Sequence, residues 1–138
     1  MATYLADKSA LTRSDTRPEV REVIEPLLLG GRIATCGIVD LELLYSAPSP
    51  ATYRQLAELL RSLPRVPVTE SAVDRALEVQ SLLADKAQHR SVPLPDLLIA
   101  ACAEAAGLTV LHYDADYGRI AELTGQPVQW VVPRGSVA

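Results

Sequence analysis

The 138-residue sequence contains no phenylalanine, and only 4% of its residues are aromatic, so leucine, valine, isoleucine and alanine must fill any core. It has two cysteines, Cys36 and Cys102. Neither belongs to a C-x-x-C pair, and neither has a histidine at the spacing of a zinc site. We therefore expect two reduced, buried thiols, as is usual in a cytoplasmic protein.

Long apolar runs are missing as well. The first residues lack the charged segment and the extended apolar stretch of a signal peptide, and no run is long enough to cross a membrane. We therefore expect a cytoplasmic protein without a membrane partner. Hydrophobic residues make up 49% of the chain and charged residues 22%, which is typical of a folded protein, and the length suits one domain.

Positive charge is scarce. The chain has 17 Asp and Glu against 13 Lys and Arg, which gives a formal net charge of −4 at pH 7. Proteins that bind nucleic acids through the phosphate backbone are usually basic. Any nucleic-acid function must therefore depend on local basic groups.

Short apolar strands alternate with helices along the chain. Strands are predicted at 4–6, 33–35, 109–113 and 128–132, with an edge-like strand at 66–68. A turn or short helix is predicted at Ser9, and longer helices at 18–28, 37–47, 53–63, 69–87, 97–106 and 117–123. This pattern predicts an α/β fold, with a short, mainly parallel central sheet and helices on both faces. We expect one domain over residues 1–133 and a short, frayed tail over 134–138.

Several acidic residues stand where a parallel sheet would bind a ligand. Asp7 follows the first strand, and Asp114 and Asp116 follow the strand at 109–113. Ligands bind beyond the carboxyl ends of such strands. Asp96 stands before an almost entirely apolar helix, where a carboxylate needs a partner. Three of these residues also have a structural explanation, because Asp96 suits the first turn of a helix and Asp114 and Asp116 suit turns or helix caps.

Glu42 is the fifth candidate. It lies in an apolar helical stretch and shares a face with Ile38 and Tyr45, unless that helix is more exposed than its composition indicates. Asp40 competes with it, because the two side chains point about 200° apart around a helix and spacing alone does not select one. Together the acids indicate a site of oxygen ligands suited to Mg²⁺ or Mn²⁺.

Four motifs resemble the PIN domain, and specifically VapC-type toxins. They are Tyr4–Ala10 with its D-x-S, Glu42–Tyr45 with E-L-L-Y, Pro95–Ala101 with D-x-x-I-A-A, and Leu111–Tyr117 with H-x-D-x-D-Y. Their order and spacing fit, so the resemblance covers essentially the whole chain. One departure is Lys8, which follows the first Asp where many relatives have a small or polar residue. We expect it to be tolerated, because that position can face solvent.

The resemblance implies a metal-dependent endoribonuclease. In it, Asp7, Glu42, Asp96 and Asp114 would be the catalytic, metal-binding acids, and Asp116 an auxiliary ligand, with Mg²⁺ or Mn²⁺ as cofactor. It also favours Glu42 over Asp40. Ser9 would correspond to the family's hydroxyl beside the metal.

The same resemblance implies partners. These are a structured RNA substrate, such as tRNA or rRNA, and a VapB-type antitoxin lying in a groove between the helices at 18–29 and 53–63. A homodimer is expected, and a heterotetramer or larger complex with the antitoxin. An RNA-processing nuclease and a catalytically idle binding module are the alternatives.

Other residues have weaker claims to a role. Candidate RNA contacts, each of which is also ordinary surface, are Lys8, Arg13, Arg17, Lys86, His89 and Arg90. Tyr45 and Tyr113 are expected to pack in the core rather than to stack on bases. His112 is expected to be a strand residue with a hydrogen-bonded ring.

Overall fold

The computed structural model describes all residues, 1–138, as four strands and seven helices. The strands are β1 (Tyr4–Ala6), β2 (Ile33–Ala34), β3 (Thr109–His112) and β4 (Val128–Trp130). The helices are α1 (Lys8–Ser14), α2 (Pro18–Leu29), α3 (Gly37–Tyr45), α4 (Pro50–Arg61), α5 (Glu70–Ala84), α6 (Leu94–Ala106) and α7 (Asp116–Thr124).

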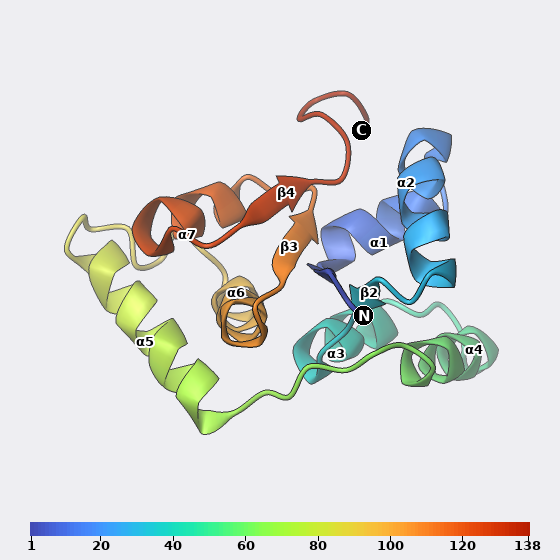
Figure 1. Cartoon of the computed structure of the whole chain (residues 1–138), viewed down its shortest axis with the longest axis horizontal. Helices are drawn as coiled ribbons and strands as arrows, with labels where there is room; N and C mark the ends of the chain where they lie inside the picture. The colour runs from blue at the N-terminus through green and yellow to red at the C-terminus, as the bar shows by residue number, and fades with distance from the viewer.

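The four strands form one sheet in the order β2-β1-β3-β4, and every neighbouring pair is parallel (Figure 1). Tyr4 of β1 is in register with Ile33 of β2 and with Thr109 of β3. The carboxyl ends of β1 and β3 therefore lie side by side at one edge of the sheet. This confirms the predicted α/β class and places the residues that follow these two strands close together.

Helices cover both faces of the sheet. On one face α1 and α2 bury Ala10, Val20 and Ile24 against the strands. The other face packs against α3, α6 and α7, and α5 covers α6 from outside (Figure 1). Helix α6 is the most deeply buried helix, which explains its apolar sequence. The side-chain amide of Gln126 donates a hydrogen bond of 2.9 Å to the carbonyl of Ala100, which ties α6 to the segment after α7.

The predicted strand at 66–68 is wrong. Thr35 pairs with Arg65 in a single parallel bridge, and the Val66 N–H donates to the Thr35 carbonyl at 2.8 Å. Pro67 follows directly and has no N–H to continue the ladder, so pairing ends there.

Several helix ends differ from prediction by one to three residues. Helix α4 begins at Pro50 rather than residue 53, because the Ser49 hydroxyl caps it by accepting the Thr52 N–H at 3.1 Å. Helix α5 ends at Ala84, and Ala87 has a φ of 56°, which no α-helix accommodates. Helix α7 begins at Asp116, one residue before the predicted start.

The C-terminal residues make hydrogen bonds to the body of the domain. The Tyr113 hydroxyl donates to the Val137 carbonyl at 2.8 Å and accepts the Val137 N–H at 3.2 Å. The side chain of Arg13 also donates to the carbonyl of Ala138. The segment expected to fray therefore folds back against the end of β3.

Two expectations from composition concern the thiols and the helices. Cys36 and Cys102 are free and fully buried, as predicted. None of the helices combines the length and the apolar character that crossing a membrane requires.

The burial of α6 generates a stability prediction. Ile99→Ala removes a fully buried side chain from the core and should lower the free energy of unfolding by about 2–5 kcal/mol. Leu29→Ala is the matched control, because Leu29 is 84% exposed and its change should stay within about 0.5 kcal/mol. Urea unfolding measures both, and equal losses for the two variants would contradict this packing.

Candidate active site

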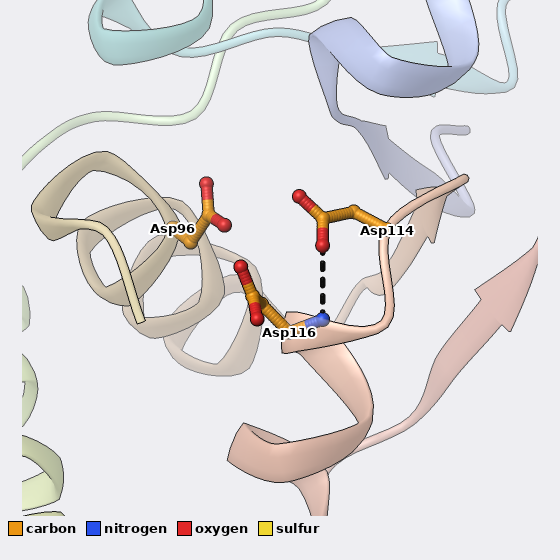
Figure 2. Close-up of side chains that lie close together, drawn as sticks. All are labelled: Asp96, Asp114 and Asp116. Carbon is orange, nitrogen blue, oxygen red and sulfur yellow. Dashed lines mark hydrogen bonds between the residues drawn. The ribbon is translucent and has the colours of Figure 1, made fainter. Parts of the chain in front are cut away.

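Three carboxylates from three elements converge beyond the end of β3. Figure 2 shows Asp96 in the first turn of α6, Asp114 after β3, and Asp116 at the start of α7, with their side chains turned toward one another. One oxygen from each lies within 4.8 Å of the others. Three of the predicted site residues thus lie close enough together for one ion to bind between them.

Asp7 joins this group through Tyr117. The Tyr117 hydroxyl donates to Asp7 Oδ1 at 2.8 Å and lies 3.5 Å from Asp96 Oδ1. Asp7 is only 3% exposed, and its second oxygen accepts the Ser9 N–H at 3.0 Å, which caps α1. Both oxygens of Asp7 are thus held by the protein, one on each side.

Tyr117 is the functional neighbour that the sequence did not identify. In the sequence it is only the aromatic residue at the end of the fourth motif. A packed ring is enough to explain an aromatic residue there, so nothing pointed to a role for the hydroxyl. The side chain is fully buried in α7. Burial, with Asp7 and Asp96 beside the hydroxyl, raises its pKa well above the ordinary value, so the hydroxyl keeps its proton and remains a donor.

Glu42 reaches the cluster from α3. Its Oε2 is 3.4 Å from the ammonium of Lys8, whereas its Oε1 is buried and has no hydrogen-bond partner. Lys8 is exposed, in agreement with the expectation that its position can face solvent, and the sequence did not predict that it also pairs with Glu42. The sequence separation of these residues hid the pair.

Asp40 lies outside the cluster. It accepts a hydrogen bond of 2.6 Å from the Thr35 hydroxyl and another of 2.6 Å from the Arg65 guanidinium. This separate ion pair holds the start of α3 against the end of β2 and the bridge at Arg65. The two acids on α3 thus point to different surroundings, as their spacing around the helix requires.

The clustered charges repel one another. The pKa of Asp96 is raised to about 8, first by burial and then by the charges of Asp7, Asp114, Asp116 and Glu42, in that order. The pKa of Asp116 is also raised, first by burial and then by Asp114. Asp96 Oδ2, like Glu42 Oε1, is buried without a partner. Buried, unpartnered carboxylate oxygens facing several others are what a bound divalent cation would satisfy.

Two polar residues brace the carboxylates without joining them. The Ser9 hydroxyl accepts the Tyr113 N–H at 2.9 Å, so it ties the start of α1 to the end of β3. His112 is buried, and its Nδ1 accepts the Asp114 N–H at 3.1 Å. Burial lowers the pKa of His112 to about 4, so the ring is neutral near pH 7. The prediction of a hydrogen-bonded strand histidine is confirmed.

The two tyrosines expected in the core differ. Tyr45 is 92% exposed at the end of α3, so its predicted packing is wrong. Tyr113 does pack, since its ring meets Trp130 edge-on and lies 4.6 Å beneath the Arg13 guanidinium. The apolar composition of α3 hid the fact that its last turn reaches the surface.

A groove lies between α2 and α4, where the family resemblance predicted one. It has a volume of about 280 Å³ and separates α2 from α4, with α1 and α3 forming its floor. Most of its lining is apolar. The leucines and isoleucine that line it are Leu11, Ile24, Leu28, Leu43, Leu56, Leu59, Leu60 and Leu63.

Sequence comparisons find close relatives of this chain. A profile described as PIN domain matches residues 4–123. Ribonuclease VapC21 of Mycobacterium tuberculosis (strain CDC 1551 / Oshkosh) is 48% identical over 134 residues, which cover 96% of each chain. Ribonuclease VapC18 of M. tuberculosis (strain ATCC 25618 / H37Rv) is 47% identical over 136 residues, which cover 97% of this chain and 98% of its own.

Solved structures share the fold. A chain of DNA-bound VapBC from Salmonella typhimurium superposes with a TM-score of 0.75 at 23% identity, covering 96% of this chain and 100% of that one. A chain of VapBC2 from Rickettsia felis, bound to a promoter DNA fragment, gives a TM-score of 0.74 at 19% identity, covering 93% and 98%. With these matches along nearly its full length, the chain belongs to the PIN-domain family and, within it, to the VapC ribonucleases.

Proposed function

We propose that the protein is the toxin of a type II toxin–antitoxin pair, a cytoplasmic Mg²⁺-dependent endoribonuclease that a VapB-type antitoxin inhibits. Residues 1–133 would form the catalytic domain. The observation that carries the proposal is the group of five carboxylates beyond β1 and β3, in a chain 48% identical to a ribonuclease. Structured RNA, such as tRNA or rRNA, is the proposed substrate.

Asp7, Glu42, Asp96 and Asp114 would hold the ion, with Asp116 as an auxiliary ligand. A divalent ion bound there would make a water molecule nucleophilic near neutral pH and would neutralise charge on the phosphate. The protein's own contribution is orientation: the Ser9 N–H and the Tyr117 hydroxyl hold Asp7, and the Asp116 N–H holds Asp114 Oδ1 at 2.9 Å. Hydrogen bonds of this kind keep ligands oriented before the ion arrives.

The acidic composition agrees with this function. Five of the 17 acidic residues belong to the proposed site, where the ion offsets their charge. One divalent ion offsets only part of this charge, so attraction to the RNA phosphates depends on nearby basic side chains.

Removing single carboxylates tests the site. Asp7→Asn and Asp96→Asn should each lower the rate of RNA cleavage at least about 100-fold, because each would remove a charged ligand from the ion. Asp40→Asn, an acid outside the cluster, should stay within about threefold of wild type. Cleavage of a fluorogenic RNA in Mg²⁺ measures all three, with EDTA as the metal-free reference. Undiminished cleavage by Asp7→Asn would refute the proposed chemistry.

The pKa of Asp96 predicts how stability depends on pH without metal. Its pKa rises from 3.8 to about 8 on folding, so the folded state binds the proton more tightly than the unfolded state. Stability in EDTA should therefore fall as pH rises from about 5 to 8, by at most about 1.4 kcal/mol per pH unit from this group. Asp96→Asn should flatten this dependence and exceed wild type in stability at pH 8.

Thermal unfolding in EDTA across this pH range measures the effect for both proteins. Added Mn²⁺ should stabilise wild type at pH 8 more than it stabilises Asp96→Asn. Parallel stability curves for the two proteins would show that Asp96 does not experience the repulsion described above.

The apolar groove between α2 and α4 is the proposed seat of the antitoxin. Leu59 of α4 lines this groove and is 50% exposed, so Leu59→Glu leaves the core intact while placing a charge in the groove. We expect affinity for the antitoxin to fall at least about 10-fold, with RNA cleavage unchanged. Calorimetry with the cognate VapB-type antitoxin measures the affinity, and an unchanged Kd would show that the antitoxin binds outside this groove.

A further inference from the structure

Lys8 is the only basic side chain that forms an ion pair with the carboxylate cluster. Its ammonium is 3.4 Å from Glu42 Oε2, and the other ion pairs of the protein involve Asp40, Glu78 and Glu104 instead. Arg119 acts on Asp116 through its charge but makes no ion pair with it. One cation is thus placed at the cluster by the fold itself.

The position of Lys8 runs against local helix preferences. It is the first residue of α1, directly after the capping Asp7, and the first turn of this helix contains no acidic residue. The amino end of a helix carries partial positive charge and disfavours a cation. A lysine there gains nothing from its own helix, so its favourable interaction is the one with Glu42.

The two carboxylate oxygens of Glu42 lie in different surroundings. Its Oε2 faces the half-exposed ammonium of Lys8, while its buried Oε1 is without a partner and remains free for an ion. A metal held by the cluster would therefore have the ammonium on the solvent side of Glu42. Asp7 and Asp96 are almost completely buried, so RNA would approach the ion from the accessible rim of the cluster, where Lys8 is about half exposed.

Charge balance shows what the ammonium adds. Five ionised carboxylates carry −5, and a single divalent ion leaves −3, which would repel an RNA phosphate. A second dication on Glu42 would correct the balance, but it would lie against the ammonium and be repelled by it. Lys8 is a strongly hydrated point charge on a flexible stem, which suits a phosphate oxygen.

From these observations we infer that Lys8 is a catalytic residue, whose ammonium contacts a non-bridging oxygen of the scissile RNA phosphate and takes the place of a second divalent ion. This inference rests on the proposed nuclease function. It predicts one tightly bound ion per chain and a direct contact between Lys8 and the RNA substrate.

The test uses Lys8→Gln and Lys8→Arg in the full chain, with Arg61→Gln as the control. Arg61 is exposed on α4, which contributes no carboxylate to the cluster, so this variant loses the same charge elsewhere. We measure single-turnover RNA cleavage in Mn²⁺, and Mn²⁺ binding without RNA by electron paramagnetic resonance. Because Mn²⁺ binding needs the assembled cluster, it also reports whether each variant folds.

Wild type should bind one Mn²⁺ tightly. Lys8→Gln should cleave about 10- to 100-fold more slowly than wild type while binding that first ion as tightly or more tightly. Lys8→Arg should recover part of the rate, and the control should match wild type. Cleavage by Lys8→Gln within threefold of wild type, or two equally tight ions in wild type, would overturn the inference alone. Failure of wild type to cleave any RNA in Mn²⁺ would instead overturn the proposed function and this inference with it.

Discussion

Mutual repulsion among the clustered carboxylates is the constraint that the surrounding structure has to meet. Asp96 is buried, and the other four acids all destabilise its charged form. The protein offsets this with fixed donors rather than with a wall of basic residues: one hydroxyl, two backbone N–H groups and a single lysine. The carboxylates are therefore held in place with little positive charge beside them, which favours the binding of a cation.

Sheet topology brings these residues together across the chain. Asp7 and Asp114 are far apart in sequence, yet β1 and β3 are adjacent parallel strands that end at the same edge. Asp96 comes from the buried end of α6, where the helix dipole also favours an anion. Asp116 follows Asp114 by two residues and supplies an N–H to it as well as a carboxylate. Four short segments thus build one site on a rigid edge.

The sequence predicts the parts of this site that depend on local pattern. The ends of the predicted strands identified Asp7 and Asp114, and the family motifs favoured Glu42 over Asp40. The roles of these acids are predictions that the proposed mutations test. Tyr117 escaped notice because its hydroxyl meets Asp7 across 110 residues, and no periodicity records that contact. The ion pair of Lys8 and the exposure of Tyr45 were missed for a similar reason, since both depend on how α1 and α3 pack.

Asp7 has two tasks, and they restrict what can replace it. One oxygen caps α1 through the Ser9 N–H, and the other receives the Tyr117 hydroxyl beside Asp96. A glutamate would keep the charge, but its longer side chain would move the carboxylate away from the cap. An asparagine would keep the cap but lose the charge. The exchange of aspartate for glutamate, usually a mild one, is therefore closed to this position, because it would disturb the helix start and the site together.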